Sequence, residues 1–357
     1  MGRRAFVVTG RTITRAAPLL GELADRGIEC VTFSVDGEPT TSVAREGTKR
    51  ALEANCDLVI GFGGGSALDT GKAVAALLTN GGEPEDYLEV IGRGSQLTRP
   101  SAPLVAVPTT AGTGAEVTRN AVLASPEQGV KVSLRSPIML PRLALVDPEL
   151  TYSLPPQATA STGLDALTQL VEPYVSIRSN PVTDALCREG IHRVARSLHR
   201  AYERGHDAAA REDMMLASLL GGLALANAGL GAVHGFAGPV GGMFPAPHGA
   251  ICARLLPHVI AVNIAALRKR LPQSVALKRY DEIGQMLAGK PEADAEDAVA
   301  WTEQTCETLH VPPLGSYGIT LQDFPALIER ATVASSMKSN PVQLTRDEMR
   351  QILERAL

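Results

Sequence analysis

The sequence is poor in aromatic residues, which make up 4% of its 357 residues and include one Trp. So few aromatic rings leave no evident platform for stacking nucleic-acid bases. A strong charge of one sign is also lacking, since 34 basic and 38 acidic residues give a net charge of −4. Without a basic field, neither nucleic acid nor an anionic membrane is expected as a partner. We therefore expect a protein that acts on small molecules.

Cysteine pairs are missing as well. No CxxC spacing occurs, and the number of cysteines, 5, is odd. This pattern argues against a disulfide framework and against a zinc site built from thiolates, and it favours a cytoplasmic location. The N-terminus has a basic start but only a short apolar run, so we interpret it as a first strand and not as a signal peptide. The cysteines are Cys30, Cys56, Cys187, Cys252 and Cys306.

One segment, residues 216–243, has almost no charge and is long enough to span a bilayer. It contains Asn227, His234 and Pro239 with repeated glycines, and it lacks flanking aromatic anchors. We therefore expect a buried helix of a soluble protein here and no membrane span.

The length of the chain predicts about two domains. In the first third, strand-like and helix-like segments alternate, which predicts a doubly wound parallel sheet with its ligand at the carboxyl ends of the strands. Beyond about residue 155, helical periodicity predominates. We predict an α/β dinucleotide-binding domain at 1–155 and an all-helical domain at 156–357. The predicted strands are 5–10, 29–35, 56–60 and 104–107, and the predicted helices are 14–26, 41–55 (capped by Thr41 or Ser42), 67–78, 159–175, 181–201, 208–230, 294–309 and 345–356.

Three glycines, Gly63 to Gly65, precede Ser66 between the third predicted strand and its helix. Backbone amides without side chains can close on a phosphate there, and the helix N-terminus adds positive potential. A tight structural turn is the alternative. A P-loop is excluded because five residues separate Gly65 from Gly71 where four are needed, and Ala73 stands where Ser or Thr is required. The segment predicts a nucleotide phosphate site without nucleoside triphosphate hydrolysis.

Two further segments of the first domain bear on a nucleotide. The second strand of a dinucleotide fold usually ends in an acid that binds the ribose hydroxyls. Depending on register, that position falls on Phe33, Ser34 or Asp36, with Ser34 preferred, so the choice between NAD and NADP stays open. The loop 108–118 is rich in small and hydroxyl residues that suit phosphate, ribose or carboxamide groups.

In the second domain, polar residues stand out against apolar surroundings. Asp165 and Gln169 are four residues apart and share one helix face. His234 and His248 are the histidines set in an apolar, Gly- and Pro-rich context, and each is followed by Gly. Either one alone fits a hydrogen-bonded core histidine, whereas the pair favours a metal or substrate site.

Four ordered motifs resemble the iron-containing (group III) alcohol dehydrogenases, which include maleylacetate reductases and are related to dehydroquinate synthase. The motifs are GGGSALDTGK, PTTAGTGAEVT, DPELTYSLPPQATASTGLDALTQ and AVHGFAGPVGGMFPAPHG, and the likeness covers nearly the whole chain. The resemblance implies a dehydroquinate synthase-like fold, in which the first domain binds NAD or NADP and the helical domain holds a divalent metal in the cleft. It further implies a homodimer that interconverts a small alcohol and its aldehyde or ketone by hydride transfer. It places Gly64, Gly65, Ser66 and Asp69 on the pyrophosphate, and Thr109, Thr110, Thr113, Thr118 and Lys131 on the ribose and nicotinamide half.

The metal ligands of that family are an Asp, a His four residues later and two further His. Asp165, His234 and His248 match three of these positions and are the candidate catalytic residues, with Fe²⁺ or Zn²⁺ as the metal. Gln169 stands at the fourth position, where an amide oxygen binds a transition metal more weakly than imidazole. Gly238 is a second departure, because dehydrogenases of this family usually carry a histidine there that is thought to relay the alcohol proton. Metal dependence therefore stays open.

Three other functions are alternatives to an alcohol dehydrogenase. A maleylacetate reductase-like enzyme would reduce a keto acid or enone with little or no metal, and Arg93 and Arg119 are candidates to hold its carboxylate, although both fit a solvated surface better. A nucleotide-binding regulator that has lost catalysis is a different class, against which the three retained metal ligands argue. A lyase of the dehydroquinate synthase type would need more Lys, Arg and His around the metal.

Overall fold

The computed structural model describes residues 1–357, and the chain forms two compact units. Unit 1 comprises residues 1–110 and 115–150, and unit 2 comprises residues 111–114 and 151–357. The short segment 111–114 thus belongs to the helical unit, although the strands before and after it in the sequence lie in unit 1. A parallel sheet followed by a helical region confirms the predicted fold class.

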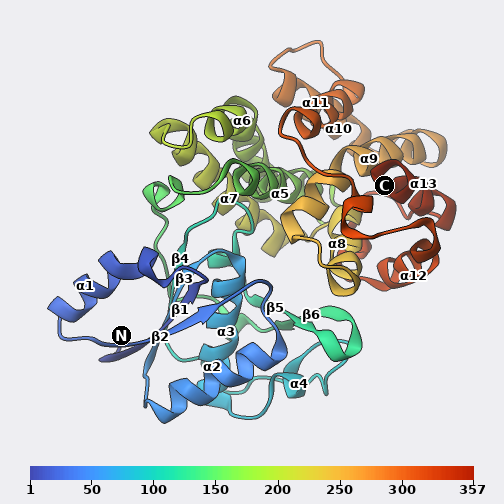
Figure 1. Cartoon of the computed structure of the whole chain (residues 1–357). Coiled ribbons are helices and arrows are strands. Elements are labelled where there is room, and N and C mark those ends of the chain that lie inside the picture. The colour runs from blue at the N-terminus through green and yellow to red at the C-terminus, as the bar shows by residue number, and fades with distance from the viewer. The chain divides into compact units, whose positions relative to one another are not determined.

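Unit 1 is built on a parallel sheet with the strand order β2–β1–β3–β4–β7 (Figure 1). Side chains of the central strand β1 alternate between two hydrophobic clusters. Phe6 and Val8 pack in one cluster, and Ala5 and Val7 pack in the other. Both faces of the sheet are therefore buried, as is typical of parallel sheets. The strands are β1 (Arg4–Gly10), β2 (Glu29–Val35), β3 (Leu58–Gly63), β4 (Leu104–Pro108) and β7 (Leu143–Ala144).

Helices cover the two faces of this sheet: α2 and α3 contribute to the cluster with Phe6, and α1 lies over the opposite face (Figure 1). Thr40 caps α2, so the prediction of Thr41 or Ser42 was wrong. Thr40 has the extended backbone that an N-cap needs, and its hydroxyl accepts a hydrogen bond from the Val43 N–H at 3.1 Å. The helices are α1 (Ala17–Asp25), α2 (Thr41–Glu53), α3 (Gly65–Asn80) and α4 (Pro84–Tyr87).

An antiparallel pair, β5 (Asn120–Ser125) and β6 (Val130–Arg135), also lies in unit 1 and was not predicted. Its inward-facing residues Ala121, Leu123 and Leu134 pack with α2 and α3 side chains in a third hydrophobic cluster. Short 3-10 helices connect the elements of the chain, namely η1 (Ile13–Ala16), η2 (Ala115–Val117), η3 (Pro126–Gln128), η4 (Pro137–Met139), η5 (Pro148–Thr151), η6 (Leu314–Tyr317), η7 (Leu321–Asp323) and η8 (Ser336–Ser339).

Unit 2 is helical throughout, and its centre is α5, which packs against α6, α7 and α9. From Gly163 to Val175, every residue of α5 is buried, polar residues included. Buried polar groups need partners, so the buried polar residues of α5 indicate a functional site on this helix. The helices are α5 (Pro156–Val175), α6 (Pro181–Glu203), α7 (Ala208–Ala228), α8 (Ala232–Met243), α9 (His248–Arg270), α10 (Val275–Ala288), α11 (Ala295–Thr308), α12 (Phe324–Val333) and α13 (Arg346–Ala356).

The uncharged segment 216–243 is divided between two helices, and the first of them ends two residues before the end of the predicted helix 208–230. α7 ends at Ala228, α8 begins at Ala232, and the two helices are bent by 100°. Gly229 ends α7 with φ +75°, a backbone conformation that favours glycine. A Cβ on Gly231 would lie 2.9 Å from a carboxylate oxygen of Glu172, so this turn comes close to α5.

By length and composition alone, α9 could cross a membrane, and the bent pair α7 and α8 passes the same test if it is taken as one span. In α9, 83% of the apolar window is buried inside the structure. A core helix of a soluble protein has this property.

Candidate active site

Four side chains with metal-binding atoms meet in unit 2. Asp165 lies on α5, His234 lies in the first turn of α8, and α9 carries both His248 and Cys252. One ligand atom from each of them lies within 4.8 Å of the others. The structure therefore brings together three of the predicted ligands, Asp165, His234 and His248. It adds Cys252, which was not predicted because the chain has no CxxC spacing. The available signal was its position four residues after His248 in one helix.

The centre of this cluster is an oxygen of Asp165. Asp165 is 1% exposed, and its Oδ1 has no hydrogen-bond partner. The Nε2 atoms of His234 and His248 lie 3.5 Å and 3.8 Å from it, too far for good hydrogen bonds. An orphaned buried carboxylate oxygen beside two imidazoles and a thiol fits a divalent transition metal, which takes these donor types.

Gln169 lies one turn beyond Asp165 on α5 and is 2% exposed. Its Oε1 is buried without a hydrogen-bond partner. The structure therefore places Gln169 near Asp165 along the helix, and its role as a metal ligand stays a prediction.

Glu172, a further turn along α5, supports the cluster and was not predicted. Its carboxylate accepts hydrogen bonds from the backbone N–H of Val233 at 2.6 Å and from Nδ1 of His234 at 2.7 Å. The second contact holds a proton of His234 on Nδ1, so Nε2 is the nitrogen that faces Asp165 and Cys252. A carboxylate behind a histidine is a common support of metal sites, and this one was recognisable only as a buried acid on the helix that carries Asp165.

The charges of the cluster are strongly coupled. Burial by itself would raise the pKa of Asp165, but the positive charges of His248 and His234 lower it to about 2. Burial would lower the pKa of His234, yet Cys252, Glu172 and Asp165 together raise it well above its ordinary value. Burial raises the pKa of the Cys252 thiol to about 12. Without a metal, positive charge on imidazole therefore balances the carboxylates.

In unit 1, the predicted phosphate site lies at the start of α3. Gly64 is the N-cap of α3, Gly65 and Ser66 open its first turn, and no side chain caps the backbone N–H groups. Such a helix end is suited to bind the pyrophosphate of a dinucleotide. A Cβ on Gly64 would lie 3.2 Å from the side chain of Thr110, so the glycine allows the two segments to approach. Thr109 is joined to this turn, because its N–H donates to the carbonyl of Gly63.

Asp69 and Thr118, two other predicted cofactor residues, both contact Lys72 within unit 1. Lys72 is fully buried, and its Nζ lies 2.8 Å from the Thr118 hydroxyl, 2.8 Å from the Asn120 carbonyl and 3.2 Å from Asp69 Oδ1. The other carboxylate oxygen of Asp69 accepts from the Val122 N–H at 3.0 Å. Asp69 and Thr118 thus connect α3 to β5 through a buried lysine.

The remaining predicted cofactor residues are spread over both units. Lys131 forms an ion pair with Glu38 at 2.7 Å, and Thr113 belongs to the segment 111–114 of unit 2. At the end of β2, Ser34 is exposed and Asp36 forms an ion pair with Arg11 at 3.4 Å.

The two arginines considered as carboxylate anchors lie on the surface. Arg93 is 82% exposed and pairs with Asp86 at 3.2 Å, and Arg119 is also exposed. Neither is buried in a way that would select a substrate carboxylate.

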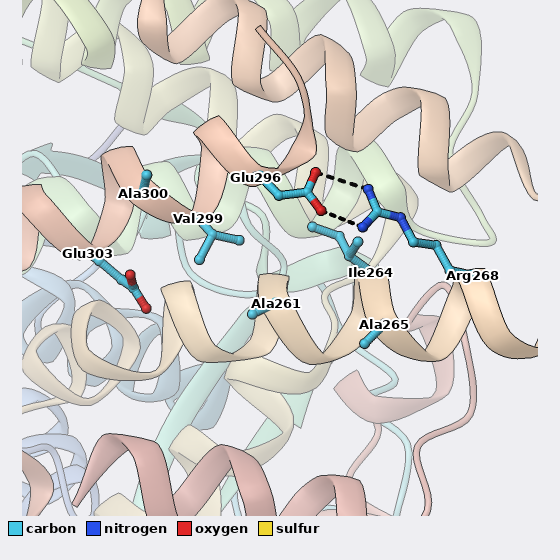
Figure 2. A pocket seen from close by; sticks show the side chains of 8 residues that line it. All are labelled: Ala261, Ile264, Ala265, Arg268, Glu296, Val299, Ala300 and Glu303. Atoms are coloured by element: carbon cyan, nitrogen blue, oxygen red, sulfur yellow. Dashed lines mark hydrogen bonds and ion pairs between the residues drawn. The ribbon is translucent and has the colours of Figure 1, made fainter.

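A cavity of about 340 Å³ lies elsewhere in unit 2, in a groove between α9 and α11 (Figure 2). Its charged residues Arg268 and Glu296 bind each other, and no residue of the metal cluster lines it. It is therefore separate from the candidate active site. Its lining residues are Ala261, Ile264, Ala265, Arg268, Glu296, Val299, Ala300 and Glu303.

The comparisons with known proteins agree with this geometry. The model of the iron-containing alcohol dehydrogenases matches residues 1–148, and the model of the C-terminal part of the Fe-containing alcohol dehydrogenase family matches residues 159–357. The chain belongs to the iron-containing alcohol dehydrogenase family. Alcohol dehydrogenase 4 of Saccharomyces cerevisiae is 37% identical over an alignment of 360 positions that covers 99% of this chain and 91% of the yeast protein.

Other proteins that this chain resembles are also enzymes. The 1,3-propanediol dehydrogenase of Klebsiella pneumoniae is 37% identical over 363 residues, 99% of this chain and 92% of that protein. The crystal structure of a 1,3-propanediol oxidoreductase has a TM-score of 0.91 and 35% identity, and the match covers 100% of this chain and 92% of that chain. The protein is an oxidoreductase of the alcohol dehydrogenase type. The maleylacetate reductase alternative receives no support.

Proposed function

We propose that this alcohol dehydrogenase interconverts a small alcohol and its aldehyde or ketone by hydride transfer with NAD or NADP. The observation that carries the proposal is the orphaned Asp165 oxygen beside the imidazoles of His234 and His248. A small substrate is supported by the relatives, which include 1,3-propanediol dehydrogenases and the sulfoacetaldehyde reductase of Bilophila wadsworthia.

Asp165, His234 and His248 would hold a divalent ion, Fe²⁺ or Zn²⁺, together with a further ligand from Gln169 or Cys252. When bound, such an ion stabilises the negative charge that develops on a carbonyl oxygen, while the nicotinamide supplies the hydride. Glu172 fixes the ring of His234 through Nδ1, so its Nε2 stays available to the ion. Burial of Asp165 excludes water from the donor atoms and strengthens their electrostatic interactions.

For the cofactor, we propose that the backbone of Gly64, Gly65 and Ser66 binds the pyrophosphate. The hydroxyl residues Thr109, Thr110 and Thr113 would contact the ribose and nicotinamide half, with Lys131 beside them. Asp69 and Thr118 would then act indirectly, because both bind Lys72 and so position α3. Both NAD and NADP are included because Asp36 and Glu38, the acids that follow β2, are each paired with a basic residue.

The alcohol proton must leave without a histidine at position 238. A Cβ on Gly238 would meet no atom within 4 Å, so this face of α8 has space for water or substrate. We propose that water or a cofactor ribose hydroxyl carries the proton.

The test is to measure NADH and NADPH oxidation with a panel of small aldehydes, ketones and keto acids, with and without Fe²⁺ or Zn²⁺. Turnover is expected with at least one carbonyl, and Asp165→Ala and His248→Ala should each lower it by about a hundredfold or more. Near wild-type turnover in both variants would refute the metal site. Tight cofactor binding without turnover of any carbonyl would favour the regulator.

We also propose that the protein is a cytoplasmic homodimer. All five cysteines are free, which suits a reducing compartment. The strand β2 stands at the edge of its sheet with one side unpaired in the single chain, and an open edge is a surface for pairing with a second copy. Light scattering after size-exclusion chromatography would give the mass of the assembly, and a monomer would refute this part of the proposal.

A further inference from the structure

Cys252 lies where a metal ligand would be expected. Its Sγ is 3.6 Å from Nε2 of His248 and 3.8 Å from Nε2 of His234. The same two nitrogens lie 3.8 Å and 3.5 Å from Oδ1 of Asp165. Both imidazole nitrogens therefore lie within 3.8 Å of a thiol and of an unpartnered, buried carboxylate oxygen.

These spacings can be compared with those around an ion. In a tetrahedral zinc site, bonds of about 2.0 to 2.1 Å to nitrogen and oxygen and about 2.3 Å to sulfur separate N from O by about 3.3 Å and N from S by about 3.6 Å. The four measured distances, 3.5 and 3.8 Å to oxygen and 3.6 and 3.8 Å to sulfur, exceed these values by no more than about half an ångström. These donor atoms are therefore only slightly farther apart than they would be around one bound ion.

We propose that the Cys252 thiolate is an inner-sphere ligand that completes the metal site in place of Gln169, and that it makes the site selective for Zn²⁺ over Fe²⁺. This inference rests on the proposed metal-dependent function. Gln169 then lies beside the site, one turn beyond Asp165 on α5, without binding the ion. A thiolate is charged and soft, whereas an amide oxygen is neutral and hard, so zinc gains more from the first.

The local structure supports this role for Cys252. His248 opens α9, and Cys252 follows four residues later on the same face. Cys252 is 0% exposed, and its Sγ lies within 4.8 Å of a carboxylate oxygen of Asp165 on α5. Zinc can add a fifth ligand during a reaction, so four protein ligands leave the proposed carbonyl chemistry intact.

The first experiment needs no variant. The metal-free protein is loaded with Co²⁺, which substitutes for zinc, and its absorption spectrum is recorded. A thiolate-to-cobalt charge-transfer band in the near ultraviolet is expected, and a spectrum without this band would overturn the proposal. The band does not depend on turnover, so it separates failure of this inference from failure of the proposed function.

The second experiment measures zinc affinity by competition with a chromophoric chelator. Cys252→Ser should lose the charge-transfer band, weaken Zn²⁺ by about a hundredfold and lower the preference for Zn²⁺ over Fe²⁺ by about tenfold. Cys306→Ser is the matched control, because the Cys306 thiol is also buried and binds the carbonyl of Ala253, next to Cys252. The control should keep both the band and the affinity.

Gln169→Leu separates the two candidate ligands. The band should persist in this variant, because sulfur still binds the ion. If Gln169→Leu abolished the band or weakened Zn²⁺ as much as Cys252→Ser does, Gln169 and not Cys252 would be the fourth ligand, and the proposal would be wrong. Should Cys252→Ser fail to fold, the cobalt spectra of the wild type and of Gln169→Leu still decide the question.

Discussion

Replacing Glu172 with Gln tests whether the carboxylate behind His234 sets its protonated nitrogen. Glu172 accepts from the Val233 N–H with one oxygen and from His234 Nδ1 with the other. A Gln of the same shape can keep only one of these contacts as an acceptor. If its oxygen stays on Val233, its NH₂ group faces Nδ1, and His234 must carry its proton on Nε2 instead. That proton would point at Asp165 and Cys252 and block the bond to a metal.

The size of this effect follows from the hydrogen bond that is lost. A hydrogen bond to a charged group contributes about 1.5 to 3 kcal/mol, and each 1.4 kcal/mol corresponds to a factor of ten in an equilibrium constant. The Zn²⁺ affinity of Glu172→Gln should therefore fall by about 10- to 100-fold, which agrees with the usual cost of losing such a supporting carboxylate.

Chelator competition would measure this affinity, and urea unfolding would measure stability in parallel. Asp213→Asn is the control, because Asp213 is buried in the same unit and binds Arg193, Arg196 and Ser197 away from the cluster. The control should lose stability and keep its zinc affinity. Wild-type zinc affinity in Glu172→Gln would refute the argument about the tautomer of His234.

Three further predictions concern other parts of the chain. Lys72→Met should lower the free energy of unfolding by about 3 to 5 kcal/mol, measured by urea denaturation, because it leaves Asp69 without its buried cation. Gly64→Val should raise the dissociation constant of NAD(P)H, measured by fluorescence, by about tenfold or more without loss of bound metal, because the added side chain collides with Thr110. His258, whose pKa is lowered to about 4 by burial and by nearby arginine charge, takes up its proton more readily in the unfolded chain. The free energy of unfolding should therefore fall by about 3 kcal/mol as the pH drops from about 6.5 to about 4, because the neutral form of His258 is the one that the fold favours. In His258→Leu, urea unfolding at these two pH values should show a smaller decrease in the free energy of unfolding.

The sequence predicted four of the five strands of the parallel sheet because β1, β2, β3 and β4 each carry a local signal, whereas the two-residue strand β7 was not predicted. Apolar runs end in glycine or proline, as in β3 and β4, and a helical pattern follows β3 directly. The antiparallel pair β5 and β6 was missed because Asn120–Ser125 has only short alternation and packs by tertiary contacts. The end of α7 at Ala228 was predicted to within two residues by the helix 208–230, whereas α8 was not predicted as a separate helix. Gly229 has a positive φ, and a Cβ built on it would lie 2.6 Å from the Oγ of Ser339, so both the backbone and the packing favour glycine at this turn.

The site was predicted where a motif pointed to it and missed where only packing reveals it. Asp165, His234 and His248 were recognised from their sequence contexts, and the structure places them together. Glu172 could not be identified in the same way, because a glutamate in an apolar helix becomes informative only when its partner, His234, is known to face it. The predicted cofactor contacts of Asp69 and Thr118 stay predictions, while the structure gives both residues a partner in Lys72.

The start of α9 explains why cysteine spacing was a poor guide to metal binding in this chain. Searches for thiolate sites rely on pairs of cysteines in one loop, whereas here a single thiol stands one helical turn after a histidine. Residues four apart in a helix share a face. The side chain at position 252 therefore points to the same side of α9 as the imidazole of His248. Asp165 and His234 approach that point from α5 and α8, so the residue at 252 has only to supply a donor atom. The identity of one helical residue can therefore set the metal preference of the site without any change in the fold around it.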